Sequence, residues 1–379
     1  MVNSVDNYCA APFVALRLQQ SGLGWGPCCA WRHEDTEPVV PGDYPDPLSH
    51  PGFADVRDRM LRGDSIGSCR LCDEARRDGL SSLREEFSER YGRPTEPRLQ
   101  YLEVTFSNLC NLRCRMCGSG ASTRWIADEL RLGIKPTAPH GHGVEDLRVP
   151  LGDIRRLRVS GGEPLLEQDK VSALLEMISD ARGGLSDLEF DMVSNGTVDI
   201  SPRLGDLLSS CGMVFLQTSL DGLPEVNAYQ RTGSSFRDIE PRIRLYNSMV
   251  GERFGHAIAC SLGVLNIDGF TDFVDWIGDE LPRTNFIIQP IYDPAWQALH
   301  NLPDPAKDLV RGMLHGWTPR NRSEHSGFDR AVRNLLDRPC ELDPGYMLGK
   351  IAQMDALTGE SFALVQPRMH EALCRALTH

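Results

Sequence analysis

The sequence predicts an α/β fold in which parallel strands alternate with helices. Three observations predict it. Short β-rich runs alternate with longer helical runs through the middle of the 379-residue chain. Residues 1 to about 90 are irregular and rich in Pro, Gly, Asp and Cys, whereas the residues after about 304 have the amphipathic pattern of helices. Such an alternation in the middle of a chain is typical of a sheet built from βα units.

Six strands are expected from runs of β-branched and apolar residues, and helices are expected in most of the gaps between them. The expected strands are Tyr101–Ser107, Arg155–Ser160, Asp187–Ser194, Met213–Leu220, His256–Leu265 and Asn285–Ile291. The expected helices are Ser122–Leu132, Gln168–Arg182, Ser235–Val250 and Phe270–Leu281. Active sites of such sheets lie at the carboxyl ends of the strands, so motifs that follow a strand carry most weight.

The segment before the first strand is expected to form a separate module. Only Phe53–Leu61 and Cys72–Tyr91 have a helical pattern there, and Gly92–Pro97 contains two prolines that break a helix and is typical of a linker. The predicted organisation is therefore an irregular cysteine-rich module over residues 1–95, the α/β domain over 96–300 and a helical C-terminal region over 301–379.

Composition excludes several classes of protein. The net charge of −13 gives no support for a nucleic-acid interface, which requires a basic face. No run of about 18 apolar residues predicts a membrane span, and no basic stretch followed by an apolar one predicts a secretion signal. The sequence therefore favours a cytoplasmic protein. Twelve cysteines in such a chain indicate metal or redox chemistry rather than disulfides, and eight of them fall within the first 117 residues.

Three cysteines follow the first strand at Cys-x3-Cys-x2-Cys spacing: Cys110, Cys114 and Cys117. Three thiolates can hold three corners of a 4Fe-4S cubane and leave one iron open, whereas a structural cluster or zinc site normally takes four protein ligands. Loop cysteines, or a zinc knuckle completed from elsewhere, are the alternatives.

A second motif, Ser160-Gly161-Gly162-Glu163-Pro164, follows the second strand. The two glycines allow the backbone to approach a ligand closely, and Glu163 offers a carboxylate to an ammonium group. Taken alone, Gly161-Gly162-Glu163 could also be an ordinary turn between a strand and a helix.

Together these motifs resemble those of the radical S-adenosylmethionine (SAM) superfamily. The resemblance implies a partial (β/α)6 barrel and a 4Fe-4S cluster whose open iron binds SAM, with Gly161, Gly162 and Glu163 at the SAM amine. It also implies cofactor contacts from residues after the third and fourth strands, with Arg231 at the SAM carboxylate. These further cofactor residues are Asn195, Ser219 and Arg231. Met116 stands where the superfamily often has an aromatic residue, and a methionine can pack against an adenine ring instead.

The N-terminal segment carries five cysteines, among them the metal-type pair Cys69-x2-Cys72. It resembles the twitch/SPASM module of radical SAM proteins, placed before the barrel rather than after it. The resemblance implies one auxiliary 4Fe-4S cluster held by Cys9, Cys28, Cys69 and Cys72, with Cys29 as the alternative to Cys28. A structural zinc site on the same thiolates is the other interpretation.

The expected activity is reductive cleavage of SAM to a 5′-deoxyadenosyl radical, with an external electron donor such as flavodoxin or ferredoxin. The radical would abstract hydrogen from a small metabolite such as a sugar or nucleoside, and the outcome would be epimerisation, dehydrogenation or sulfur insertion. Two alternatives stay open: a maturase that modifies a ribosomal precursor peptide, and an iron–sulfur scaffold or sensor without enzymatic activity.

The remaining cysteines are expected to be small buried hydrophobes, namely Cys211, Cys260, Cys340 and Cys374. Cys260 lies in the fifth expected strand, where an inward side chain would face a barrel lumen. The resemblance to radical epimerases implies a possible role for Cys260 as hydrogen donor, and core packing is the alternative.

Overall fold

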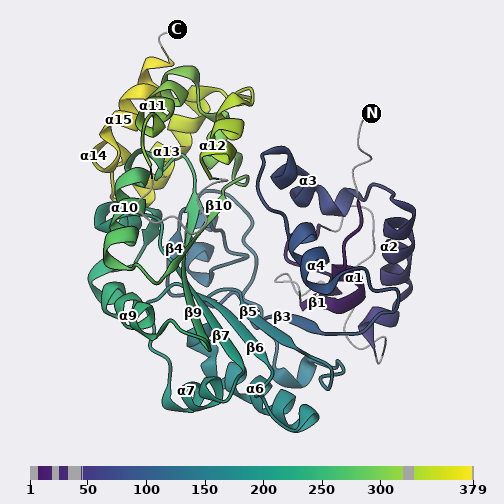
Figure 1. Cartoon of the computed structure of the whole chain (residues 1–379). Helices are drawn as coiled ribbons and strands as arrows, with labels where there is room; N and C mark the ends of the chain where they lie inside the picture. Colours follow the sequence, from purple (N-terminus) through teal and green to yellow (C-terminus); the bar gives the residue numbers. More distant parts are fainter. Residues whose placement is uncertain (1–6, 19–24, 33–43, 45, 319–327, 378–379) are drawn as a thin grey trace. The chain divides into compact units, whose positions relative to one another are not determined.

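The computed structural model describes residues 7–18, 25–32, 44, 46–318 and 328–377 (Figure 1). Its main sheet has the strand order β10-β9-β7-β6-β5-β3-β1-β2. The pairs β1–β3, β3–β5, β5–β6 and β9–β10 are parallel, and β1–β2 is antiparallel. The predicted α/β fold with a mostly parallel sheet is confirmed.

All six expected strands are present, with ends that differ by a few residues from those predicted. They are β3 (Tyr101–Thr105), β5 (Arg156–Ser160), β6 (Glu189–Ser194), β7 (Met213–Ser219), β9 (Phe254–Leu262) and β10 (Asn285–Pro290). Leu157 and Val159 of β5 are completely buried, whereas the alternate positions of this strand keep some exposure. The sheet is therefore apolar on one face and polar on the other in this region.

The N-terminal segment also contributes strands, which the sequence analysis did not predict. They are β1 (Ala15–Leu18) and β2 (Trp25–Gly26). Strand β1 pairs with β3, and the register places Arg17 opposite Glu103. Strands of four and two residues are too short to show an alternating pattern, which explains why the sequence did not reveal them.

The prediction of one helix over Cys72–Tyr91 is wrong, because two helices occupy this stretch: α3 (Arg70–Arg77) and α4 (Leu83–Tyr91). Gly79 has a φ of +75°, which ends the first helix. Ser82 then starts the second, because its side chain accepts a hydrogen bond from the backbone of Glu85 while the Glu85 carboxylate accepts one from the backbone of Ser82.

The other helices surround the strands or follow them along the chain. In the first 300 residues they are α1 (Ala11–Val14), α2 (Pro51–Arg62), α5 (Ile126–Arg131), α6 (Gln168–Arg182), α7 (Pro202–Ser209), α8 (Pro224–Gln230), α9 (Phe236–Met249) and α10 (Phe270–Glu280). The C-terminal region is helical as predicted, with α11 (Asp304–Leu314), α12 (Phe328–Asp337), α13 (Pro344–Thr358), α14 (Phe362–Val365) and α15 (Pro367–Arg375).

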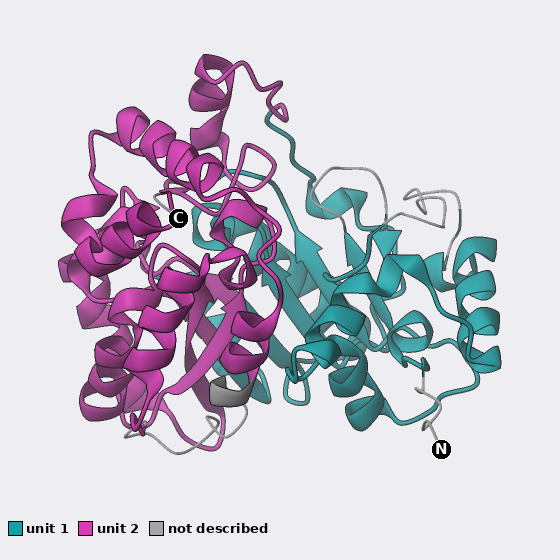
Figure 2. Cartoon of the chain, turned by 90° about the horizontal axis from the view of Figure 1, so that it is seen from above, with its two compact units in different colours: residues 1–109, 139–192, 200–215 teal, residues 110–138, 193–199, 216–379 magenta. Residues whose placement is uncertain are grey.

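The chain divides into two compact units, shown in separate colours in Figure 2. Unit 1 comprises residues 1–109, 139–192 and 200–215, and unit 2 comprises residues 110–138, 193–199 and 216–379. In unit 2 the C-terminal helices share one hydrophobic core with β9 and α10. The division into modules 1–95, 96–300 and 301–379 stays a prediction. Within the described residues, no helix is long and apolar enough to cross a membrane.

Candidate active site

The three cysteines that follow β3 come together in unit 2. Cys114 lies in the short strand β4 (Arg113–Cys114), which pairs with β8 (Arg231–Thr232), and the Cys117 amide donates to the Cys114 carbonyl at 3.0 Å. Cys110 and Cys114 are buried in one hydrophobic cluster, against which Cys117 packs. The loop of residues 110–117, which we call the cluster loop, therefore directs all three thiols to one place.

Hydrogen-bond donors surround these sulfur atoms. The Leu112 amide donates to Cys110 Sγ at 3.4 Å and Asn195 Nδ2 lies 3.8 Å from the same atom, while Arg231 Nη1 lies 3.7 Å from Cys114 Sγ. The hydrogen bond between Cys114 and Cys117 lowers the pKa of the Cys117 thiol and, together with burial, raises the pKa of Cys114, whereas Arg231 lowers the pKa of both. Such donors stabilise thiolates, the form in which cysteine binds iron. The residues present therefore fit a 4Fe-4S cluster.

Arg231 is held by a carboxylate that the sequence analysis did not single out. Arg231 Nε lies 2.8 Å from Asp221 Oδ2, and Asp221 Oδ1 also accepts from the Ser261 amide at 2.7 Å. Burial raises the pKa of Asp221, and Arg231 offsets part of this effect. The pair fixes the guanidinium beside the cluster loop. Asp221 lies two residues after Ser219 in the sequence. Its negative charge was the one signal in the sequence that could have suggested a pair with the positively charged Arg231.

The backbone of the cluster loop is fixed by side chains that follow it in the sequence. Trp125 Nε1 donates to the Cys114 carbonyl at 2.9 Å, and Ser122 Oγ donates to the Leu112 carbonyl at 2.6 Å. Ser122 and Trp125 border a 3-10 turn (Thr123–Trp125) that leads into α5. The Cys114 carbonyl thus accepts a second hydrogen bond besides that from the Cys117 amide, and both bonds fix the backbone of the loop.

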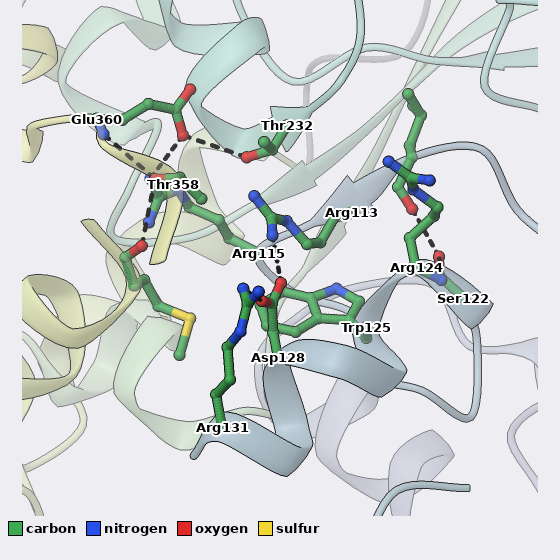
Figure 3. Close-up of polar contacts among 12 residues, drawn as sticks. Arg113, Arg115, Ser122, Arg124, Trp125, Asp128, Arg131, Thr232, Thr358 and Glu360 are labelled. Atoms are coloured by element: carbon green, nitrogen blue, oxygen red, sulfur yellow. Dashed lines mark hydrogen bonds and ion pairs between the residues drawn. The ribbon is translucent and has the colours of Figure 1, made fainter. Parts of the chain in front are cut away.

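Arg115 links the cluster loop to the C-terminal region (Figure 3). Its side chain is only 1% exposed, and its guanidinium carbon lies 3.7 Å from the centre of the Tyr229 ring. Arg115 Nη2 donates to Thr358 Oγ1 and Glu360 Oε2, both at 2.9 Å, and lies 3.2 Å from Asp355 Oδ1. Tyr229 OH donates to the same Asp355 oxygen at 2.8 Å. One buried guanidinium thus joins the loop to the end of α13.

The glycine motif lies in unit 1 against the backbone that leads into the cluster loop. The Glu163 amide donates to the Leu109 carbonyl at 2.8 Å, and Leu109 directly precedes the first cluster cysteine. A Cβ atom on Gly162 would lie 2.1 Å from the Leu109 oxygen, so only glycine fits there. Glu163 is 1% exposed, and its Oε1 accepts from the Leu165 amide at 3.0 Å. Glu163 therefore also acts as the cap of the following turn.

Four of the five N-terminal cysteines line one cavity in unit 1: Cys9, Cys28, Cys69 and Cys72. Burial raises the pKa of Cys28 well above its ordinary value, and the neighbouring thiols raise it further. Burial raises the pKa of Cys9 to about 12 and that of Cys69 to about 11. Binding of a metal centre would therefore release protons from these thiols.

The fifth N-terminal cysteine has different neighbours. Cys29 does not line the cavity, and the charged side chains that act on its thiol are Glu103, Arg17 and Arg158. Arg84 lines the cavity and lowers the pKa of Cys69 against the effect of burial. The donor set of four thiols with one guanidinium fits an iron–sulfur cluster, since the cation offsets part of the charge on the thiolates.

Within the described part of the chain, no three His, Cys, Asp or Glu side chains are arranged to hold a single metal ion. Each thiolate around a cubane binds a different iron, so cluster ligands lie further apart than the ligands of one ion.

The positions of two further predicted site residues, Cys260 and Ser219, do not support a role in catalysis or cofactor binding. Cys260 is completely buried in the core shared by β9 and α10, where Asn266 Nδ2 lies 3.6 Å from its sulfur. This placement corresponds to the packing alternative and offers no support for a hydrogen donor. Ser219 ends β7 and is half-buried.

Residues 104–276 match the sequence profile of the Radical SAM superfamily. Residues 104–276 therefore form a radical SAM domain. Membership implies SAM and a 4Fe-4S cluster as cofactors, and radical SAM enzymes typically use external reductants.

Two curated relatives of this chain are GTP 3′,8-cyclases. A GTP 3′,8-cyclase of Paenarthrobacter nicotinovorans is 29% identical over 151 residues, which are 40% of this chain and 38% of that protein. The GTP 3′,8-cyclase of Synechococcus elongatus is 26% identical over 242 residues, which are 61% of this chain and 67% of that protein. The chain thus spans well under half the length of the first of these two relatives.

Solved structures are similar at a lower level. Native anSMEcpe with bound AdoMet has a TM-score of 0.40 and 16% identity, covering 63% of this chain and 60% of that one. Streptococcus suis SuiB bound to precursor peptide SuiA has a TM-score of 0.36 and 14% identity, covering 69% of this chain and 58% of that one.

Proposed function

We propose that this protein reductively cleaves SAM at a 4Fe-4S cluster held by Cys110, Cys114 and Cys117. The observation that carries the proposal is the convergence of these three cysteines in one loop, where the sulfur atoms of Cys110 and Cys114 receive hydrogen bonds. When bound, the cluster supplies the electron that cleaves SAM to a 5′-deoxyadenosyl radical. The chain holds the thiolates, binds the polar end of SAM and keeps water from the site.

Incubation of the anaerobically reconstituted, reduced protein with SAM tests this function. We expect 5′-deoxyadenosine to form and methionine to appear with it. Reconstituted protein that holds iron but forms no 5′-deoxyadenosine would instead favour the iron–sulfur scaffold or sensor.

Glu163→Gln is expected to weaken SAM binding by about tenfold, or about 1.4 kcal/mol, without removing the cluster. The amide oxygen of glutamine can still accept from the Leu165 amide, so the turn is preserved while the charge that attracts the SAM ammonium is lost. Equilibrium binding of SAM to the reconstituted variant measures the effect.

Glu167→Gln is the matched control, because Glu167 lies in the same turn and its carboxylate already binds Lys170 at 2.7 Å. An unchanged SAM affinity in Glu163→Gln would show that Gly161-Gly162-Glu163 serves only as a turn.

The proposal includes one auxiliary 4Fe-4S cluster on Cys9, Cys28, Cys69 and Cys72. It is supported by the shared cavity of these four residues and by Arg84 beside Cys69. Cys28 is preferred over Cys29 because only Cys28 lines the cavity. The cluster would serve as an electron conduit, as a ligand of the substrate or as a sulfur donor.

Cys28→Ala and Cys29→Ala form a matched pair of variants at adjacent positions. Cys28→Ala is expected to lower the iron content from about eight to about four atoms per chain, because one ligand of the second cubane is lost. Cys29→Ala is expected to keep about eight, and both variants are expected to form 5′-deoxyadenosine. Metal analysis of the reconstituted proteins distinguishes them. Equal loss in both variants, or zinc in place of the second set of irons, would contradict the assignment.

The proposed substrate is a small metabolite, with a precursor peptide as the alternative. The relatives whose name specifies a substrate are GTP cyclases, which favours a nucleoside- or sugar-like molecule. Product analysis with candidate metabolites and peptides, read out as substrate-dependent consumption of SAM, separates the two classes.

A further inference from the structure

One face of the sheet in unit 1 carries a row of charged residues. The registers of β1, β3, β5 and β6 place one residue of each strand side by side in the order Arg17, Glu103, Arg158, Asp191. The signs of the four charges therefore alternate across four neighbouring strands. Arg156 lies on the same face, two residues before Arg158. We call these five residues the charged row.

The central strands of a parallel sheet are usually apolar on both faces, because helices cover both. Here Leu157 and Val159 are completely buried, whereas Arg156, Arg158 and Ser160 keep accessible surface. Solvent therefore reaches the arginines of the charged row, although β5 lies in the interior of the sheet, whereas the carboxylates Glu103 and Asp191 are buried. A polar, accessible face on a central strand indicates a surface that is kept open for a ligand.

The two carboxylates of the charged row are fully engaged by the protein. Glu103 accepts from Arg17 Nε and Ser160 Oγ, both at 3.0 Å, and from Tyr101 OH at 3.4 Å. Asp191 Oδ2 accepts from Arg156 Nη2 at 2.9 Å and Arg158 Nη1 at 2.8 Å.

Arg158 differs from the other two guanidiniums. Arg17 binds Glu103, and Arg156 binds both Asp191 and Glu86, the latter at 3.1 Å. Within the described residues, Arg158 donates only to Asp191, and its side chain is 19% exposed. A guanidinium has five N–H donors in a planar fork that matches a carboxylate or a phosphate. Arg158 is thus held in place by one bond and presents its other donors to the accessible face.

Arg158 lies near two other features of unit 1: the N-terminal cysteines and the motif Gly161-Gly162-Glu163. The thiol of Cys29 lies close to the guanidiniums of Arg158 and Arg17. Cys29 is adjacent in the sequence to Cys28, which lines the cavity of the auxiliary cysteines. At the other end, Ser160 lies on the same face as Arg158 and directly precedes Gly161. The charged row therefore borders both sites within unit 1.

We propose that Arg158 binds an anionic group of the substrate, a carboxylate or a phosphate, on this face of the sheet. The proposal rests on the proposed function, because it names the class of substrate that the radical acts on. Asp191 and Glu103 orient the guanidiniums, and the N–H donors of Arg158 that Asp191 does not engage are the ones available to the ligand.

The test uses acetate and methylphosphonate as probes of the two anionic groups. Saturation-transfer NMR on the reconstituted, oxidised protein measures their dissociation constants, which we expect on the order of 1–10 mM for a single group of a larger ligand. Arg158→Gln is expected to weaken the preferred probe by about tenfold, because a bidentate charged contact is lost. Preference for acetate indicates a carboxylate substrate, and preference for methylphosphonate a phosphorylated one.

Arg203→Gln is the control, because Arg203 lies on α7 in the same unit and is an exposed arginine bound to Glu176. It is expected to bind both probes like the wild type. Arg158→Lys keeps a charge for Asp191 and serves as a second variant if Arg158→Gln does not fold. It is expected to bind about threefold more weakly, because an ammonium lacks the planar fork.

Equal binding by wild type and Arg158→Gln, or no binding of either probe by the wild type, would refute the proposal. Either result is independent of SAM cleavage, which is measured separately as 5′-deoxyadenosine. A protein that binds the probes but does not cleave SAM would refute the proposed function and leave the anion site intact.

Discussion

Replacing Cys110, Cys114 and Cys117 together by alanine is expected to abolish 5′-deoxyadenosine formation and to lower the iron content from about eight to about four atoms per chain. The loss is complete because the three thiolates are the only protein ligands that a SAM-binding cubane takes. The remaining iron would belong to the proposed auxiliary cluster, whose cysteines line one cavity in unit 1. Iron analysis and chromatography of the reaction mixture measure both effects.

Cys374→Ala is the control for the loss of a thiol outside either site, since Cys374 lies in α15. It is expected to keep its iron and to cleave SAM at the wild-type rate. Continued cleavage of SAM by the triple variant would refute the assignment of the cluster loop, and complete loss of iron would refute an independent auxiliary cluster.

Arg115→Ala is expected to destabilise the protein by about 3–5 kcal/mol, the usual cost of removing one partner of a buried ion pair. Asp355 and Glu360, with side chains 18% and 29% exposed, would lose their shared cation, and the Tyr229 ring would lose the guanidinium that stacks on it. The cluster loop would also lose its link to α13. We therefore expect lower iron occupancy at the SAM-binding cluster in addition to a lower unfolding temperature.

Arg124→Ala is the matched control, because Arg124 is an exposed arginine in the turn that follows the cluster loop (Figure 3). Denaturant unfolding of the metal-free proteins gives the change in stability, and iron analysis after reconstitution gives the occupancy. A change below about 1 kcal/mol in Arg115→Ala would mean that the link contributes little more than a surface ion pair.

Residues that are close in the sequence and follow a strand could be predicted well. The spacing of Cys110, Cys114 and Cys117 and the pair Gly161-Gly162 are local signals, and the structure places both directly after parallel strands. The six central strands were predictable for a similar reason, because each is long enough to show its apolar character.

Other parts of the site depend on contacts that the sequence does not encode locally. Arg115 and Glu360 are 245 residues apart, and nothing near either residue indicates that they meet. Cys28 and Cys29 could not be distinguished from the sequence, because it does not show which of two adjacent side chains points toward the other cysteines. The charged row was not predicted either, since it requires the register of four strands, one of which was not expected.

The link between Arg115 and the end of α13 has a consequence for the order in which the two cysteine sites are completed during synthesis. The cavity of the auxiliary cysteines draws all its lining residues from the first 87 residues, so that site can form early. The cluster loop is anchored by Thr358 and Glu360, which the ribosome adds more than 240 residues after Cys117. Because domains generally fold as their chain emerges, the two sites mature at different times. The loop that carries the proposed SAM-binding cysteines stays unanchored on that side for most of translation, so we expect its iron to be delivered after residues 358 and 360 have been added.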